Sequence, residues 1–217
     1  MAKPAYWDRA RGELLRADPV IGAIIERCGD AHLASRGDPF VTLARSIVGQ
    51  QISVKAAQSV WSRLEASAKE VTPERIARMR APTLRRCGLS DRKVEYVRDL
   101  ARHFRDGVVD PGQWARLDDE AIIEQLTQVR GVGRWTAEMF LIFNLLRPDV
   151  LPLDDLGVLR AVAQHYGGND AATLSFTGAQ GRALRTAVSE VGERWRPWRT
   201  VATWYLWRSL DPVPVEY

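Results

Sequence analysis

The sequence predicts an all-α fold, because apolar residues recur at helical spacing along nearly the whole chain. No segment alternates apolar and polar residues at period two over a convincing length, so we expect no substantial sheet. Residues that favour helix N-caps stand directly before several of the periodic segments, which supports the same fold class.

The first clear helix is expected to begin at Pro39, with Asp38 as its N-cap. The Gly-Gln-Gln sequence at 49–51 predicts a break in this helix. Apolar residues at helical spacing resume after the break, which predicts a second helix over 53–66.

Further helices are predicted in the middle of the chain, over 72–79 and up to Gly107, with Thr72 and Ser90 as their N-caps. A helix starting at Asp118 follows and runs to about residue 129, with a single apolar stripe.

The C-terminal third predicts helices over about 155–166, ending at Gly167 and Gly168, then around 181–192, and a last one opened by Pro197. Four of the eight tryptophans fall within the final 23 residues. Tryptophans at helical spacing are more often core than binding residues, so we expect a structural role for Trp195, Trp198 and Trp204.

Composition limits the functional classes. The 217 residues are 46% hydrophobic, and the balance of 31 basic and 27 acidic residues gives a net charge of +4, which permits an anionic partner without requiring one. Two cysteines, Cys28 and Cys87, are too few for a four-thiolate site, so we expect no iron-sulfur cluster. The N-terminus lacks the apolar core of a signal peptide, and the longest apolar run, 139–146, is too short to span a bilayer. We therefore expect a cytoplasmic protein without a membrane partner.

The segment "VRGVGR", 129–134, predicts a tight turn between two helices. Gly131 and Gly133 can take positive φ and leave room for an approaching group. Their N–H groups, with those at the start of the next helix, suit an anion such as phosphate. A plain helical corner with glycine as the C-cap explains the turn alone equally well.

Four separated motifs in order carry a family resemblance. The segment "QVRGVGRWTAEMF" resembles the helix-hairpin-helix of DNA repair proteins, although Val-Arg stands where the usual form has Leu-Pro. "LPLDDLGVLRAV" downstream is similar to the acidic segment of the helix-hairpin-helix (HhH-GPD) DNA glycosylase superfamily. "ARSIVGQQIS" and "ERWRPWRTVATWYLWR" resemble its alkylation-repair (AlkA-like) branch, and the four motifs cover residues 38–210.

The resemblance implies two helical subdomains with an active-site cleft between them. A six-helix subdomain over 36–150 is expected to carry the helix-hairpin-helix at about 122–146. Residues 1–35 and 151–217 are expected to form the second subdomain, with the catalytic aspartate and the C-terminal aromatic residues.

The resemblance also implies DNA-binding residues. Gly131 and Gly133 are expected to grip the backbone, with Arg134 either as a supplementary charge or as an ordinary surface arginine. Gln51 is expected to enter the duplex in place of the flipped nucleotide, unless Gln-Gln is only a surface turn. No cofactor is required, but the family's hairpin holds a monovalent cation, Na⁺ or K⁺, on backbone carbonyls that match Thr127, Val129 and Val132.

By the same resemblance the catalytic carboxylate is Asp155, directly before Leu-Gly, rather than its neighbour Asp154. Cleavage of a glycosidic bond creates positive charge on the sugar, which a nearby carboxylate stabilises. Capping of a helix would be the default role of this pair if the hairpin were absent.

The base pocket implied by the resemblance contains Trp135 and Trp207, with Met139 and Phe40 shaping it. Electron-rich rings suit a cationic alkylated base. Met139 replaces a tyrosine of the resembled enzymes, which bears on the substrate range.

Trp135 stands where strand-cleaving relatives have a lysine that forms a Schiff base. We therefore expect a monofunctional glycosylase that flips alkylated bases such as 3-methyladenine and 7-methylguanine out of duplex DNA, excises them and leaves an abasic site, acting as a monomer. The alternatives are a glycosylase for deaminated or mismatched bases and a non-catalytic DNA-binding module.

Overall fold

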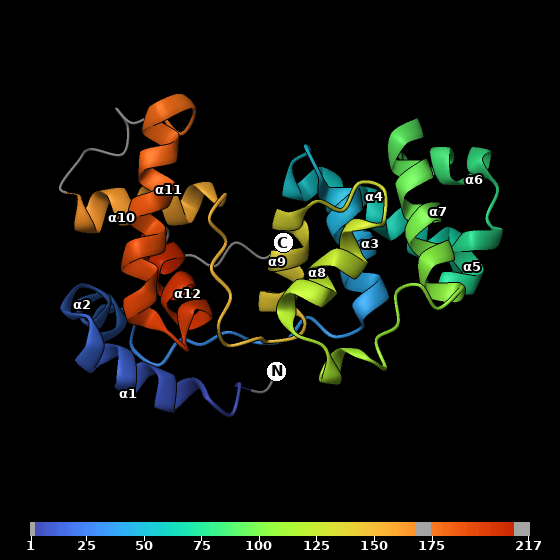
Figure 1. Ribbon diagram of the computed structural model, residues 1–217. Coiled ribbons are helices and arrows are strands. Elements are labelled where there is room, and N and C mark those ends of the chain that lie inside the picture. The colour runs from blue at the N-terminus through green and yellow to red at the C-terminus, as the bar shows by residue number, and fades with distance from the viewer. Residues whose placement is uncertain (1–2, 168–174, 211–217) are drawn as a thin grey trace. The chain divides into compact units, whose positions relative to one another are not determined.

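The computed structural model describes residues 3–167 and 175–210, and these residues form helices with no strand among them (Figure 1). The all-α prediction is therefore confirmed. In these same residues, no helix is both long enough and apolar enough to cross a bilayer. Gly168, one of the two glycines expected to end a helix, lies outside the described ranges.

The chain divides into two compact units. Unit 1 consists of Met1–Ser35 and Leu141–Glu216, and unit 2 consists of Arg36–Phe140. The resemblance predicts subdomains over 36–150 and over 1–35 with 151–217, and the compact units divide after residues 35 and 140. The residues after 140 are tied to the N-terminal segment, because the Tyr6 hydroxyl donates to the Leu146 carbonyl at 2.8 Å and the Ser35 hydroxyl to the Asn144 carbonyl at 3.0 Å.

Unit 2 contains a series of short and medium helices, of which the last continues into unit 1. They are α3 (Pro39–Gly49), α4 (Val54–Ala68), α5 (Pro73–Arg78), α6 (Ala81–Arg86), α7 (Asp91–Arg105), the 3-10 helix η1 (Trp114–Arg116), α8 (Asp119–Thr127) and α9 (Arg134–Phe143). Seven of these are α-helices, all within described residues, where six were expected. Helix α6 was not predicted, because it has six residues and no side-chain N-cap.

The three N-caps that the sequence predicts in unit 2, Asp38, Thr72 and Ser90, are confirmed, because each side chain accepts a hydrogen bond from a backbone N–H three residues later. Asp118, where the sequence predicts a helix to start, is in the same way the N-cap of α8. Pro39 occupies the first turn of α3, and α4 resumes at Val54 after the Gly-Gln-Gln break.

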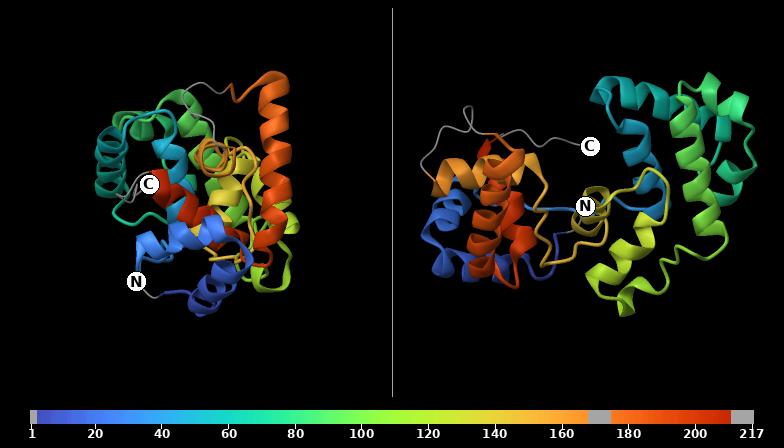
Figure 2. Two further views of the ribbon diagram at one scale, coloured as in Figure 1. Left: turned by 90° about the vertical axis from the view of Figure 1, so that its left-hand side faces the viewer. Right: turned by 45° about the horizontal axis from the view of Figure 1, so that its top comes forward.

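Helix α7 runs through the middle of unit 2 and packs against α3, α5 and α6 (Figure 2). Its buried face includes Val94, Val97, Leu100 and Ala101, at the spacing of one helical stripe. Because both the hairpin and the α3–α4 turn are bonded to α7, this helix sets the positions of the two candidate DNA-binding elements.

Unit 1 is built around α12, which packs against α1, α2 and α10 (Figure 2). Its described helices are α1 (Trp7–Ala17), α2 (Pro19–Cys28), α10 (Leu156–Tyr166), α11 (Gly178–Gly192), the 3-10 helix η3 (Glu193–Trp195) and α12 (Arg199–Leu210). The last helix begins two residues after Pro197 and α11 begins three residues earlier than expected, within the usual uncertainty of helix ends.

The C-terminal tryptophans expected to have a structural role pack within unit 1, where Trp195 and Trp198 are buried and Trp204 is half-buried. Trp195 is fully buried, and its indole N–H donates to Asp18 Oδ2 at 3.0 Å. Asp18 also caps α2, so one buried carboxylate joins the N-terminal and C-terminal segments. Trp198 donates to Glu13 at 2.6 Å, and Trp204 packs edge-on against Trp7 at 5.3 Å.

Candidate active site

Asp155 is the N-cap of α10 and is nearly buried, with 9% of its surface exposed. Its Oδ1 accepts hydrogen bonds from the Val158 backbone N–H at 2.8 Å and from the Trp207 indole N–H at 2.7 Å. These two donors fix the orientation of the carboxylate. The helix N-terminus adds a favourable electrostatic field for its negative charge.

The two adjacent aspartates have different environments. Asp154 is exposed, and its side chain forms an ion pair with Arg185 at 2.6 Å, across the start of α10 and the middle of α11. Asp155 is nearly buried, and its side chain is held by the backbone N–H of Val158 and by the indole N–H of Trp207. Asp155, the candidate catalytic carboxylate, is therefore also the cap of α10, and Asp154 is not the cap.

Trp207 comes from α12 and stacks on Phe143, with the ring centroids 5.5 Å apart and the planes inclined by 13°. Gly157 makes the approach of Trp207 to Asp155 possible. A Cβ at position 157 would lie 2.8 Å from Trp207 Cδ1 and 3.0 Å from Asp155 Oδ1. Sequence reasoning missed both Phe143 and Gly157, although Gly157 stands inside the quoted Leu-Asp-Asp-Leu-Gly motif.

The hairpin in unit 2 uses its two glycines differently. Gly131 has φ of +85°, and a Cβ there would lie 2.2 Å from the Tyr96 ring. Gly133 does not have positive φ, and a Cβ there would meet nothing within 4 Å. Gly131 is therefore needed for the turn itself, while Gly133 leaves the start of α9 open to an approaching group.

The α3–α4 turn presents Gln51, an exposed residue with φ of 59°, which is rare for a residue other than glycine. Two neighbours hold this strained turn. The Gln50 amide donates to the Gly131 carbonyl at 2.9 Å, and Lys93 Nζ donates to the carbonyls of Val48 and Gln50 at 2.7 Å each. Burial lowers the pKa of Lys93.

Gln50 and Lys93 were not among the predicted site residues. Lys93 gave no sequence signal, since it lies on a different helix from the turn that it holds. The next residue along the turn, Ile52, is 40% exposed, so an aliphatic side chain stands beside the amide of Gln51.

Arg134, the expected supplementary charge, is already ion-paired. Its guanidinium bonds Glu120 at 2.5 and 2.9 Å and Glu138 at 3.0 Å. The hydrogen bonds to Glu120 raise the pKa of Arg134, since they favour its charged form. Its charge is thus balanced within unit 2.

The predicted pocket residues of unit 2 differ in exposure. Trp135 is 43% exposed at the start of α9, and Met139, one turn later, is half-buried. Phe40 is 3% exposed and packs edge-on against Phe104 at 5.4 Å. Phe40 is therefore a core residue of unit 2, whereas Trp135 is an exposed residue.

Backbone carbonyls at the end of α8 are the candidate cation ligands. Thr127 is the last residue of α8, where carbonyls lack intrahelical partners and carry the negative end of the helix dipole. The Val129 carbonyl accepts the Val132 N–H at 3.0 Å, which leaves one of its lone pairs. The described residues contain no group of three or more His, Cys, Asp or Glu side chains suited to a metal.

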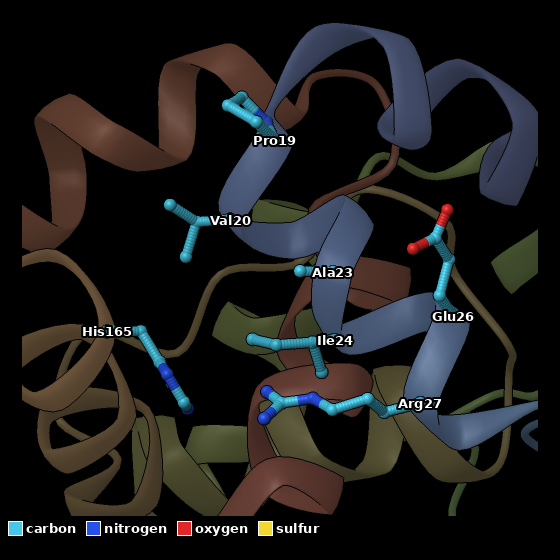
Figure 3. A pocket seen from close by; sticks show the side chains of 7 residues that line it. All are labelled: Pro19, Val20, Ala23, Ile24, Glu26, Arg27 and His165. Carbon is cyan, nitrogen blue, oxygen red and sulfur yellow. The ribbon is translucent and has the colours of Figure 1, made fainter.

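A hollow of about 700 Å³ in unit 1 lies between α2 and the end of α10, where Val20, Ala23 and Ile24 line it beside Arg27 and His165 (Figure 3). Burial, followed by the charge of Arg27, lowers the pKa of His165. His165 is ten residues from Asp155 on the same helix, or about 15 Å along its axis. This hollow is therefore separate from the candidate catalytic carboxylate.

Comparison with known families decides the identity. The profile described as "HhH-GPD superfamily base excision DNA repair protein" matches residues 44–177, which include the α3–α4 turn, the hairpin and Asp155. The chain belongs to this superfamily. Within it, the relatives place the chain in the AlkA-like branch of 3-methyladenine DNA glycosylases.

One protein sequence and two solved structures show how similar this HhH-GPD chain is to its relatives. DNA-3-methyladenine glycosylase 1 of Schizosaccharomyces pombe is 34% identical over 176 residues, which is 79% of this chain and 72% of that protein. The crystal structure of a DNA-3-methyladenine glycosidase from Bacillus halodurans is 33% identical, with a TM-score of 0.81 over 93% of this chain and 89% of that one. The Schizosaccharomyces pombe 3-methyladenine DNA glycosylase Mag1, solved in complex with abasic DNA, is 30% identical, with a TM-score of 0.74 over 96% and 98% of the two chains.

The superfamily match does not extend to the whole candidate site of this HhH-GPD chain. Trp207 lies outside the matched residues, 44–177, although its indole is bonded to Asp155. The hydrogen bond between Trp207 and Asp155 is therefore shown by the structure of unit 1 and is not part of the superfamily match.

Proposed function

We propose that this protein is a monofunctional DNA glycosylase that excises alkylated bases from duplex DNA and leaves an abasic site. The observation that carries the proposal is the nearly buried Asp155, held by Trp207 and by the start of α10, in a chain of the HhH-GPD superfamily. The relatives named DNA-3-methyladenine glycosylases support alkylated bases as the substrate class.

Asp155 would stabilise the positive charge that develops on the sugar when the glycosidic bond breaks. The bonding electron pair leaves with the base nitrogen, and water then adds to the sugar carbon and loses a proton. An alkylated purine is already cationic, so it departs as a neutral base and needs little general-acid assistance. A single, rigidly oriented carboxylate is therefore sufficient for this reaction.

The base-binding side chains would be Trp135 and Met139 from unit 2 and Trp207 from unit 1. A cationic base gains about 1 to 2 kcal/mol from a desolvated aromatic face. Phe143, stacked on Trp207, holds that ring in its orientation. Phe40 would act only through the packing of unit 2, because it lies in the core.

The absence of strand cleavage rests on Trp135. An indole cannot form the Schiff base that a lysine amine forms with the sugar.

The turns of unit 2 would contact DNA. Gly131 and Gly133 would present backbone N–H groups to DNA phosphates, and Gln51 would fill the space left by the flipped nucleotide. Na⁺ or K⁺ would bind the backbone carbonyls of Thr127, Val129 and Val132. The protein would act as a monomer in the cytoplasm, since one molecule is enough for one lesion.

The test is the release of free 3-methyladenine and 7-methylguanine from methylated duplex DNA by the wild type, Asp155→Asn and Asp154→Asn. Asp154→Asn is a matched control, because it removes the adjacent, exposed carboxylate, which pairs with Arg185. We expect base release by the wild type and by Asp154→Asn, loss of release in Asp155→Asn, and strand nicks only after alkali treatment. Nicks before alkali would contradict the monofunctional assignment. Binding without release of either base would direct attention to neutral lesions or to a binding module.

A further inference from the structure

The positive charge of this protein is concentrated on α5, α6 and the start of α7. Residues 75–93 contain seven basic residues and one acidic residue, a net charge of +6, whereas the whole chain carries +4. The remainder of the chain is therefore slightly acidic. We call residues 75–93 the arginine segment.

Most of the charge in the arginine segment is not balanced by neighbouring carboxylates. Arg85 pairs with Asp91 at 2.5 Å. Over the part of the chain that the structure describes, no carboxylate lies within ion-pairing distance of Arg78, Arg80, Arg86 or Arg92. These residues are exposed, and of them Arg86 also donates to the Thr83 hydroxyl at 3.2 Å.

Part of the arginine segment forms a small pocket of about 220 Å³. It is lined by Ser67, Arg75, Arg78, Met79, Arg80 and Thr83. Three arginines, a serine and a threonine are thus among the lining residues, and planar guanidinium groups match the oxygens of a phosphate. The donor set therefore suits a phosphate group better than a neutral ligand.

The hairpin, by contrast, lacks free positive charge. Residues 118–138 contain two arginines and five acidic residues. Arg130 pairs with Glu95, and Arg134 pairs with Glu120 and Glu138. The hairpin can offer backbone N–H groups, but it does not supply the net positive charge that affinity for a polyanion requires.

The arginine segment is continuous with the elements proposed to contact DNA. Its last residue, Lys93, bonds the carbonyls of Val48 and Gln50 in the α3–α4 turn at 2.7 Å. In Figure 1, α6 and the start of α7 lie toward the same edge of unit 2 as the hairpin. A duplex held at the hairpin therefore has neighbouring phosphates within reach of this surface.

We propose that the arginine segment binds the phosphate backbone of the duplex beside the lesion and supplies much of the electrostatic affinity for DNA. This inference rests on the proposed function for the choice of duplex DNA as the partner. Phosphate contacts of this kind position a protein on DNA and carry no base specificity.

The experiment measures the affinity of the full chain for a short undamaged duplex as a function of salt. Two charge-matched test variants are Arg78→Gln with Arg80→Gln, and Arg86→Gln with Arg92→Gln. The control is Arg105→Gln with Arg116→Gln, which removes two arginines from the far end of α7 and from η1. Circular dichroism and thermal unfolding confirm that all variants fold.

Each lost phosphate contact lowers the slope of log affinity against log salt by about 0.9. Between about 50 and 200 mM salt, the wild type should therefore lose about tenfold more affinity than a test variant that has lost two contacts. The control should retain the wild-type slope. Equal slopes in test and control variants would overturn the proposal, as would binding of the wild type that is insensitive to salt.

Base release from methylated DNA is measured in parallel to separate the two proposals. If the wild type releases alkylated bases while the test variants keep its salt dependence, the arginine-segment proposal fails and the glycosylase proposal stands. If the test variants lose salt dependence while no enzyme releases a base, the DNA surface stands and the proposed reaction fails.

Discussion

The indole N–H of Trp207 donates a 2.7 Å hydrogen bond to Asp155 Oδ1, joining α12 to the residue that caps α10. The same oxygen accepts the Val158 N–H, so two donors from different elements hold one carboxylate oxygen. This arrangement makes the orientation of Asp155 depend on tertiary packing, and not only on its own helix.

Replacing Trp207 by phenylalanine should slow base release without unfolding the protein. Phenylalanine keeps an aromatic ring against Phe143 but removes the indole N–H. A hydrogen bond to a charged group contributes about 1.5 to 3 kcal/mol, so we expect a 10- to 100-fold lower single-turnover rate. The measurement is base release from methylated duplex with enzyme in excess. Trp204→Phe is the control, because Trp204 packs against Trp7 and Tyr205, and an equal loss in that variant would indicate general damage to α12.

Alanine at Gly157 should also reduce activity, even though alanine is usually the better helix former. In a helix interior, Gly→Ala stabilises by up to about 1 kcal/mol. Here the added Cβ would lie 2.8 Å from Trp207 Cδ1 and 3.0 Å from Asp155 Oδ1, so one of these groups must move. We expect base release to fall at least about tenfold, because misplaced catalytic groups are costly. Unchanged release would mean that the Trp207 contact is not needed for Asp155 to act.

Local signals explain why much of the fold could be predicted from the sequence. The caps at Asp38, Thr72, Ser90 and Asp118 act within three residues, and helical periodicity is a property of each segment alone. Helix α6 gave no such signal, because it has six residues and, unlike the equally short α5, no side-chain N-cap. The boundary at 140 depends on hydrogen bonds between the N-terminal segment and residues after α9, which no local pattern shows.

The candidate site was predicted as a set of residues, but not as a set of contacts. Motif resemblance named Asp155 and Trp207, yet only the fold shows their hydrogen bond and the role of Gly157 between them. The ion pairs of Arg134 could be predicted from the sequence only in part. Its partner Glu138 is one turn away and could have been foreseen from spacing, whereas Glu120 approaches it only because the hairpin folds back.

The two hairpin glycines should respond differently to alanine. At Gly131, positive φ costs a residue with a Cβ about 1 to 2 kcal/mol, and the clash with Tyr96 adds to this. We expect Gly131→Ala to lower the free energy of unfolding by at least about 2 kcal/mol. Gly133→Ala has room and should change stability by less than about 0.5 kcal/mol, but it should weaken duplex binding.

Urea denaturation and duplex binding, measured on both glycine variants, test this difference. A large stability loss in Gly133→Ala, or none in Gly131→Ala, would contradict the division of roles. Normal DNA affinity in a stable Gly133→Ala variant would show that the hairpin does not approach DNA at this position.

Asp99 should stabilise the hairpin in a pH-dependent way. Burial acts to raise the pKa of Asp99, but hydrogen bonds from the Arg130 N–H at 3.0 Å and from Arg102 at 2.9 Å outweigh it and lower that pKa. A folded pKa below the unfolded value gives stability that is present above about pH 4 and is lost as the pH falls through the folded value. We expect Asp99→Asn to be about 2 kcal/mol less stable than the wild type at neutral pH, with the difference shrinking in acid. Urea denaturation of both proteins across this pH range tests the prediction. A stability difference that does not change with pH would assign the effect to packing rather than to charge.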